Sequence, residues 1–231
     1  MELAWISIYL LFLPMAKIRL AIADDHTIVR KGYVAMLQTE DDFEVIADAE
    51  NGKQLLVQLA LHKESADVCL LDISMPEMNG YDTLVALREL YPKMKFLILT
   101  QLEHEYVIVR MLKAGASGYM LKTIGPAELV HAIKTILANP YYNNKLVNGK
   151  LISLVQKGEE YKKLALTPRE EEFLKLCCSE LPYKQIATEM RIEERTVAYY
   201  RQSLFEKLDV KSRIGLALYA LKLGLVPMDD V

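Results

Sequence analysis

The 231-residue sequence has little of what marks secreted or broadly nucleic-acid-binding proteins. It holds three cysteines, Cys69, Cys177 and Cys178, which are too few for a disulfide framework and fit a reducing compartment such as the cytoplasm. Its formal net charge of −3 excludes a nucleic-acid-binding surface spread over the whole molecule, so any such function must rest on a local basic patch. The composition, 52% apolar and 26% charged, is that of a globular protein with one large or two small domains.

The N-terminal stretch MELAWISIYLLFLP, residues 1–14, is apolar but too short to span a bilayer. It has no positively charged start and no small-residue cleavage site, so it does not read as a signal peptide. The second methionine, Met15, opens MAKIRLAIADD, which is typical of the start of a domain. We therefore interpret residues 1–14 as an upstream-start extension or a disordered tail and expect no membrane partner, with membrane tethering as the alternative.

Residues 15–138 alternate short apolar runs with segments whose apolar residues recur at i, i+3 and i+4. Continuous apolar strands separated by helices predict a parallel sheet that is covered on both faces. Five strands and five helices in this length predict a doubly wound, flavodoxin-like α/β domain. The predicted strands are 18–23, 43–49, 68–72, 95–100 and 117–121.

The rest of the chain reads as a linker and an all-α domain. Residues 139–163 are rich in Asn, Gly and Lys without a clean period, which favours a linker with one short helix. The domain at 164–231 begins with Thr167 as N-cap, Pro168 at the first helical position and Glu170 three residues after the cap, a capping box. Three further helices are predicted, at about 182–190, 194–208 and 212–223.

Polar side chains stand where strands of the predicted sheet end. Asp24 and Asp25 follow the first strand, Asp72 closes the third, Thr100 ends the fourth and Lys122 follows the fifth. Because the carboxyl ends of parallel strands meet at one edge of a sheet, we expect these five groups to form one site rather than separate caps on four strands.

The residue types indicate the chemistry of this site. Clustered carboxylates repel one another unless a cation joins them, and their hard oxygens suit Mg²⁺. A carboxylate can attack a phosphoryl group to form an acyl phosphate. A metal, a lysine and a hydroxyl would then stabilise the charge of the transferring group.

Four stretches closely resemble the receiver domain of two-component response regulators over about residues 16–138. The resemblance implies that Asp72 accepts a phosphoryl group from the phosphohistidine of a sensor histidine kinase. It implies that Lys122 contacts this group, that Thr100 swings toward it and that Tyr119 turns inward on activation. The stretches are ADD at 23–25, LLDISMPEMNGYD at 70–82, Thr100, and GYMLK at 118–122.

The same resemblance assigns a metal site. It implies that Asp25, Asp72 and the backbone carbonyl of Ser74 bind Mg²⁺ directly, while Asp24 acts mostly through water. It also implies that Gly80 allows the bend into the third helix. We interpret His26 as a residue that starts a helix rather than as a metal ligand.

The helices at 182–190 and 194–208 are separated by a short turn, a helix-turn-helix pattern. The second helix has one apolar stripe facing the core and a second stripe that could enter a major groove, formed by Arg195, Ala198, Tyr199 and Gln202. Residues 195–213 carry five Lys and Arg against two Asp and Glu, although the whole of 164–231 carries ten against eleven. The candidate phosphate contacts are Lys184, Arg201, Lys207, Lys211 and Arg213.

This part resembles the LuxR-type helix-turn-helix of the NarL/FixJ class over about residues 164–226. The resemblance rests on LTPREEEFLKL, YKQIATEM, RTV at 195–197, LFEKLDVKSR and LYALKLGLV. There are departures: the lysine usual after the Thr-Val pair is Ala198, the histidine often found two residues later is Tyr200, and a usual glycine is replaced within CSELPY. The loss of the lysine removes one expected DNA contact.

Together the resemblances imply a transcriptional response regulator that binds promoter DNA under the control of phosphorylation, as a homodimer when phosphorylated. One alternative is a phosphorelay or protein-interaction module whose helical domain does not bind DNA, because that domain is net acidic and lacks the lysine. Another is an aspartate-nucleophile phosphatase. Such enzymes usually carry a second acid two residues after the first, and Ser74 stands there, so we expect no enzyme.

Overall fold

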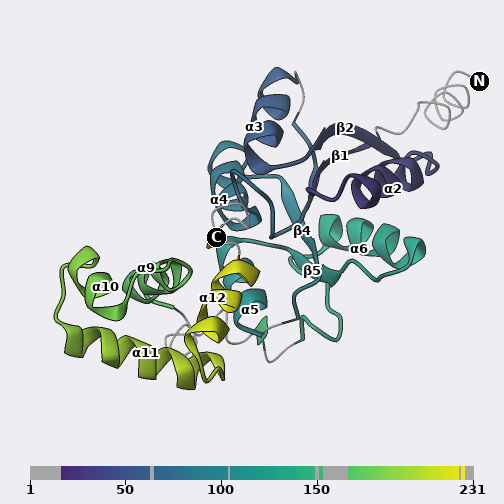
Figure 1. Cartoon of the computed structure of the whole chain (residues 1–231). Coiled ribbons are helices and arrows are strands. Elements are labelled where there is room, and N and C mark those ends of the chain that lie inside the picture. The colour runs from purple at the N-terminus through teal and green to yellow at the C-terminus, as the bar shows by residue number, and fades with distance from the viewer. Residues whose placement is uncertain are drawn as a thin grey trace, which may run out of the picture.

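The computed structural model describes residues 17–62, 65–103, 105–148, 151–152, 166–223 and 225–226 (Figure 1). Residues 1–14, interpreted above as an extension, and most of the second half of the predicted linker lie outside this part of the chain. Within the described residues, no helix is long and apolar enough to cross a membrane.

A five-stranded parallel sheet forms the centre of the first domain, as predicted, in the order β2-β1-β3-β4-β5. Its strands follow the predicted apolar runs to within one residue, because a strand buried on both faces must be apolar at every position. They are β1 (Ile18–Ala23), β2 (Phe43–Ala49), β3 (Val68–Leu71), β4 (Lys95–Thr100) and β5 (Gly118–Leu121).

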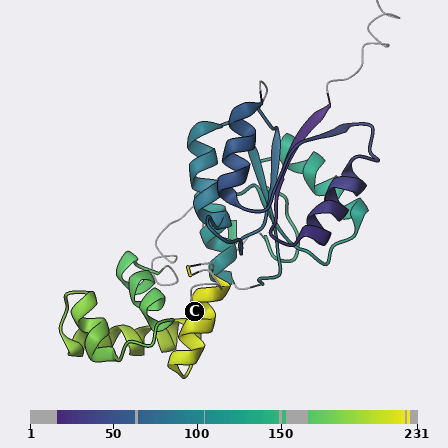
Figure 2. The ribbon, with the colours of Figure 1, turned by 45° about the horizontal axis from the view of Figure 1, so that its top comes forward.

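Helices cover both faces of this sheet (Figures 1 and 2). On one face, α2 (Thr27–Leu37) and α6 (Pro126–Ala138) pack on alternate residues of the strands. On the other face lie α3 (Gly52–Leu61), α4 (Gly80–Leu90) and α5 (Glu105–Ala114). The chain leaves β1 for β2 on one side and later returns to pair β3 on its other side, so β1 and β3 flank a topological switch point.

The second domain is helical, and its elements are close to those predicted. It comprises α9 (Pro168–Cys177), α10 (Tyr183–Glu189), α11 (Glu194–Leu208) and α12 (Arg213–Lys222). The predicted capping box at Thr167 and Glu170 is confirmed, with Pro168 in the first turn. Tyr200, which stands where the family often has a histidine, packs its ring near Phe173, with 6.1 Å between the ring centroids.

The first part of the predicted linker is packed along β5. The backbone N–H of Tyr142 donates to the carbonyl of Ser117 at 2.8 Å, and the side-chain amide of Asn144 donates to the carbonyl of Tyr119 at 2.8 Å. Tyr142 and Val147 are buried. These contacts cover the free edge of the sheet and join residues 139–148 to the first domain.

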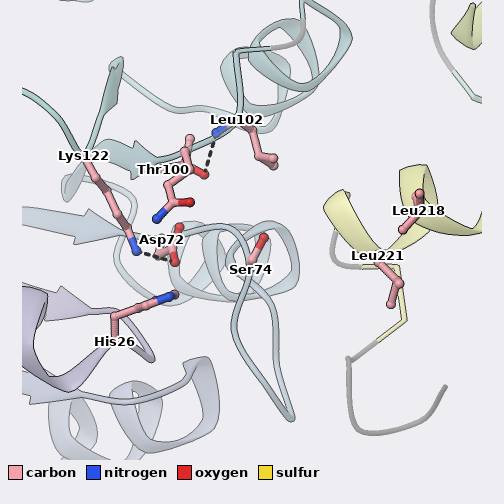
Figure 3. A pocket seen from close by; sticks show the side chains of 9 residues that line it. His26, Asp72, Ser74, Thr100, Leu102, Lys122, Leu218 and Leu221 are labelled. Carbon is pink, nitrogen blue, oxygen red and sulfur yellow. Dashed lines mark hydrogen bonds and ion pairs between the residues drawn. The ribbon is translucent and has the colours of Figure 1, made fainter. Parts of the chain in front are cut away.

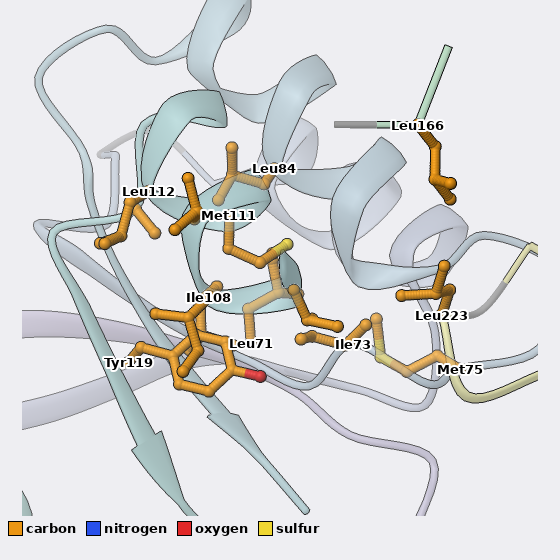
Figure 4. Close-up of a cluster of buried hydrophobic side chains, with 14 of the residues drawn as sticks. Leu71, Ile73, Met75, Leu84, Ile108, Met111, Leu112, Tyr119, Leu166 and Leu223 are labelled. Carbon is orange, nitrogen blue, oxygen red and sulfur yellow. The ribbon is translucent and has the colours of Figure 1, made fainter. Parts of the chain in front are cut away.

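The two domains contact one another. Met75, in the loop after β3, belongs to the same buried cluster as Leu166 before α9 and Leu223 after α12 (Figure 4). An ion pair joins α5 to α9, with Arg110 Nη2 3.2 Å from Glu171 Oε1. The helical domain is therefore held against the same end of the sheet at which the predicted site lies.

Candidate functional site

Three predicted site residues meet in one buried cluster at the carboxyl end of the sheet. Lys122 Nζ lies 2.8 Å from Asp24 Oδ2 and 2.8 Å from Asp72 Oδ2, so one ammonium bridges both carboxylates. The side chains of Asp24 and Asp72 are each 3% exposed. Because these residues follow β1, β3 and β5, the sheet itself sets the distances between them. Figure 3 shows Lys122 and Asp72 pointing toward one another.

Asp25 and His26 complete an acidic rim around this cluster. Ligand atoms of Asp24, Asp25, His26 and Asp72 all lie within 4.8 Å of one another. His26 is the N-cap of α2, which confirms that it starts a helix. Its Nδ1 also lies 2.7 Å from Asp25 Oδ1, a contact that the sequence did not indicate.

The charge state of the site follows from its burial. Burial raises the pKa of Asp72 to about 6, although Lys122 opposes this shift. Burial alone would lower the pKa of Lys122, but Asp72 and Asp24 together raise it above its ordinary value. Three carboxylates against one ammonium leave an excess of negative charge, and their oxygens converge, so the residues present fit a hard divalent cation such as Mg²⁺.

The loop after Asp72 holds this carboxylate in place. Asp72 Oδ1 accepts a hydrogen bond from the backbone N–H of Ile73 at 2.7 Å, and the N–H of Gly80 donates to the carbonyl of Ile73 at 2.9 Å. A Cβ on Gly80 would lie 2.0 Å from the carbonyl oxygen of Asp72. Glycine is required at this position because the loop after Asp72 approaches so closely.

Thr100 and Tyr119 lie on neighbouring strands and share one partner, Leu102. The Thr100 hydroxyl oxygen accepts from the Leu102 N–H at 3.4 Å, and the Tyr119 hydroxyl donates to the Leu102 carbonyl at 2.8 Å. Tyr119 is buried and already occupies the inward position, so its movement on activation stays a prediction. Burial raises the pKa of Tyr119, which keeps the hydroxyl protonated as a donor.

A pocket of about 290 Å³ opens above the acidic cluster, and α12 forms its far wall (Figure 3). Leu218 and Leu221 of α12 face the residues of the first domain across it. The lining residues from the first domain are His26, Asp72, Ser74, Thr100, Gln101, Leu102 and Lys122. Sequence reasoning missed this arrangement, because no local pattern encodes how two domains pack.

The stripe on α11 predicted to enter a major groove is open to solvent. Arg195, Ala198, Tyr199 and Gln202 are exposed, and the Tyr199 ring is 70% exposed. Among the candidate phosphate contacts, Lys184 and Lys211 are also exposed.

Three other candidate phosphate contacts are engaged within the helical domain. Lys207 Nζ lies 2.9 Å from the buried Glu170 carboxylate, and the Arg201 guanidinium lies 5.3 Å from the centre of the Tyr183 ring. Arg213 donates to four backbone carbonyls between residues 176 and 181. The structure thus gives these three cations internal partners that the charge pattern could not reveal.

Comparisons with known proteins agree with both halves of the structure. The family described as response regulator receiver domain matches residues 20–134, and the family described as bacterial regulatory proteins, luxR family, matches residues 164–220. The chain is also 34% identical over 227 residues to the transcriptional regulatory protein DegU of Brevibacillus brevis, which covers 91% of this chain and 95% of DegU. The chain belongs to the NarL/FixJ family of response regulators.

Other relatives of this response regulator support the same assignment. It is 33% identical over 201 residues to the nitrate/nitrite response regulator protein NarL of Escherichia coli K12, covering 86% of this chain and 92% of NarL. RcsB from Salmonella enterica serovar Typhimurium, solved bound to a promoter with the phosphomimetic BeF3⁻, matches with a TM-score of 0.65 and 24% identity. That match covers 90% of this chain and 99% of RcsB and supports the two-domain fold.

The sequence of this response regulator also did not indicate a buried arginine behind the site. Arg30, on α2, donates to the backbone carbonyl of Asp24 and to the carboxylates of Asp48 and Glu50. An arginine within an amphipathic helix ordinarily reads as solvent-exposed. The signal that could have found it is its place four residues after His26, one helical turn from the acidic rim.

Proposed function

We propose that this response regulator controls transcription by accepting a phosphoryl group on Asp72 from a sensor histidine kinase and by binding promoter DNA when phosphorylated. The observation that carries the proposal is the buried Asp24–Lys122–Asp72 cluster on a chain that also presents an open helix-turn-helix face. The protein would act in the cytoplasm, where it would meet both the kinase and DNA.

The transfer step uses groups already in place. One oxygen of Asp72 attacks the phosphorus of the phosphohistidine, the P–N bond breaks, and the imidazole leaves with its electron pair and takes up a proton. The Ile73 N–H holds Asp72 Oδ1, so Oδ2 beside Lys122 is the oxygen oriented to react. Lys122 then moves its hydrogen bond from the carboxylate to a phosphoryl oxygen, which replaces one anionic partner by another.

The acidic cluster would hold Mg²⁺ through Asp25, Asp72 and the Ser74 carbonyl, with Asp24 acting through water. When bound, the ion would neutralise charge on the transferring phosphoryl oxygens. Ser74 lines the pocket beside Asp72, as this assignment requires. Ser74 also stands where an aspartate-nucleophile phosphatase would usually carry a second acid, which argues against hydrolysis over many turnovers.

The signal would pass from the site to the helical domain across the pocket. The Thr100 hydroxyl is bonded weakly to Leu102, at 3.4 Å, and is free to turn toward a phosphoryl group. Leu102 lines the pocket opposite Leu218 and Leu221 of α12, so its movement would disturb the contact between the domains. The freed α12, whose Ile214 and Leu218 side chains are largely exposed, would then join two copies of the chain as a homodimer.

The DNA contacts would come from α11. Arg195, Tyr199 and Gln202 stand on one exposed stripe that could contact base edges in the major groove, and Lys184 and Lys211 could contact phosphates. Because Arg201, Lys207 and Arg213 have internal partners, the phosphate contacts are fewer than the charge count suggested. That observation keeps open a second candidate function, a phosphorelay or protein-interaction module.

Binding of duplex promoter DNA to the purified protein tests the proposal. It should be measured with and without acetyl phosphate plus Mg²⁺, at two salt concentrations, for the wild type and Asp72→Asn. We expect binding that tightens with the phosphodonor, weakens with salt and does not respond to the phosphodonor in Asp72→Asn. Phosphate uptake without DNA binding in any state would favour the relay function, and uptake by Asp72→Asn would refute the acceptor assignment.

A further inference from the structure

Arg30 is a buried cation that the transfer chemistry does not use. Its side chain is 4% exposed and is held by three acceptors on two different strand ends. Nε lies 2.6 Å from Asp48 Oδ1, Nη2 lies 2.9 Å from Glu50 Oε1, and Nη1 lies 2.5 Å from the backbone carbonyl oxygen of Asp24. Each of the three guanidinium nitrogens therefore donates to an acceptor.

The acceptor on Asp24 is the carbonyl of the peptide that joins Asp24 to Asp25. Because a peptide unit is planar, fixing its carbonyl direction fixes the direction in which the chain continues into Asp25. The other side of the same residue is also held, since the Asp24 N–H donates to the Ala49 carbonyl at 3.1 Å. Ala49 lies between Asp48 and Glu50, so the end of β2 holds Asp24 once directly and once through Arg30.

This arrangement is costly for a purely structural contact. A buried guanidinium loses its hydration, and an apolar side chain of similar size would often stabilise the core as well. Only an arginine can reach three acceptors with one planar group, because lysine offers a single point charge. On Asp24, Arg30 contacts the backbone carbonyl and not the carboxylate, so it does not compete with a cation for the carboxylate oxygens of the acidic cluster.

We propose that Arg30 is a positioning residue for the divalent-cation site: it fixes the Asp24–Asp25 peptide and thereby sets the affinity for Mg²⁺. The proposal rests on the proposed function, since it concerns the same acidic cluster. Residues that orient metal ligands from behind typically change metal affinity roughly 10-fold to 100-fold when they are substituted.

Isothermal titration calorimetry of the unphosphorylated full-length protein with Mg²⁺ tests this proposal. Arg30→Lys keeps the charge but removes the fork, and we expect its Mg²⁺ dissociation constant to rise by about 10-fold. The rate of phosphorylation by acetyl phosphate at saturating Mg²⁺ should stay within about twofold of the wild type, because Asp72 and Lys122 are not touched. If Arg30 had a merely structural role, Arg30→Lys would lower stability without weakening Mg²⁺ binding while leaving the maximal rate unchanged.

Lys31→Met is the matched control. Lys31 is the neighbouring cation, it pairs with the same Asp48 carboxylate, and its side chain is 61% exposed. It should bind Mg²⁺ as the wild type does. If Arg30→Lys does not fold, Glu50→Gln loosens the guanidinium from its exposed outer side and should raise the dissociation constant by less than the roughly 10-fold expected of Arg30→Lys.

Wild-type Mg²⁺ affinity in a folded Arg30→Lys protein, or in Glu50→Gln where that variant replaces it, would overturn the proposal. So would an equal loss of affinity in Lys31→Met. These outcomes are distinct from failure of the proposed function, which would show as phosphate uptake by Asp72→Asn or as no uptake by the wild type. The positioning role can thus fail while Asp72 remains the acceptor.

Discussion

At the scale of single residues, the geometry of Asp72 depends on how closely α4 approaches the loop that carries it. Asn79 caps α4 by accepting the N–H of Asp82 at 2.9 Å, and Gly80 follows with its N–H on the Ile73 carbonyl. The loop after Asp72 and the start of α4 are therefore in van der Waals contact along their backbones. Only glycine, whose side chain is a single hydrogen atom, fits where two backbones approach so closely.

Replacing Gly80 by alanine should displace the loop after Asp72. The new Cβ would lie 2.0 Å from the Asp72 carbonyl oxygen and 2.8 Å from the Ile73 Cα, both of them backbone atoms that cannot rotate away. We expect a loss of about 1–3 kcal/mol in stability and a slower uptake of phosphate from acetyl phosphate. Urea denaturation and a phosphorylation time course would measure the two effects.

Gly32→Ala provides the comparison for this experiment. Gly32 lies within α2, and a Cβ added there meets nothing within 4 Å. Alanine should be neutral or more stable by up to about 1 kcal/mol at this helical position. Equal stability of Gly80→Ala and the wild type would mean that the loop can move without cost.

At the scale of elements, α9 is fixed by a carboxylate that serves two helices. Glu170 accepts from the Thr167 N–H at 2.7 Å and from Lys207 Nζ at 2.9 Å, and it thereby ties the start of α9 to the last turn of α11. Burial alone would raise the pKa of Glu170, but the Thr167 N–H and Lys207 lower it below its ordinary value of 4.5. The carboxylate therefore stabilises the domain in its ionised form.

Glu170→Ala should destabilise the helical domain by about 2 kcal/mol at pH 7, since it leaves the Lys207 ammonium partly buried without this partner. The sign of the pH dependence follows from the lowered pKa. The stabilisation is fully present above about pH 4.5 and is lost as the pH falls through the lower pKa of the folded state. Hydrogen exchange in α9 and α11 should show the variant and the wild type converging at acid pH. A constant gap would contradict the ionic origin of the effect.

The segment that covers β5 depends on Asn144. Its amide donates to the Tyr119 carbonyl, while its Oδ1 accepts the N–H groups of Leu146 and Val147 at 2.9 and 2.7 Å. Asn144→Ala should cost about 1–3 kcal/mol and speed amide exchange and proteolysis in residues 140–148, because the loop loses its internal bonds. The exposed neighbour Asn143 offers a control, and Asn143→Ala should behave as the wild type. Equal protection of both variants would show that burial of Val147 alone holds the segment.

The sequence predicted the elements well and the contacts between elements poorly, for physical reasons. Each strand is a continuous apolar run, and the rule that ligands lie beyond the carboxyl ends of strands placed Asp72 and Lys122 in one site. Asn144 could not be placed, because its partner lies 25 residues away on β5 and leaves no periodic trace. Arg30 was missed for the reverse reason, since its helix reads as amphipathic and a charge there is usually exposed.

At the scale of the whole molecule, the described contacts hold α12 over the pocket that contains Asp72. Leu218 and Leu221 face Asp72 and Thr100 across the pocket, while Met75 and Leu223 lie in one buried cluster. Of the two α12 residues proposed to join two copies, Leu218 thereby faces the pocket in this arrangement, while Ile214 is 71% exposed. Uptake of phosphate and exposure of α12 should favour one another, because both require the same contact to loosen.

The ion pair between Arg110 and Glu171 provides a way to shift this balance without altering the acceptor site. Its side chains are 11% and 25% exposed, so the pair is only weakly screened by solvent. Glu171→Arg would set two cations against each other between α5 and α9. If this costs the closed arrangement about 1 kcal/mol, the open population rises roughly fivefold. Phosphorylation by acetyl phosphate should become faster by a similar factor.

The charge-swapped double variant decides whether the ion pair is the cause. Arg110→Glu together with Glu171→Arg restores an ion pair in which the two charges have exchanged places. It should return the phosphorylation rate toward that of the wild type. Arg110 also lies 3.9 Å from the centre of the Tyr81 ring, a contact that the glutamate loses, so the return should be incomplete. A rate in the double variant as high as in Glu171→Arg would show that attraction between these two charges does not set the balance. A rate unchanged in Glu171→Arg would show that the two domains are not coupled through this face.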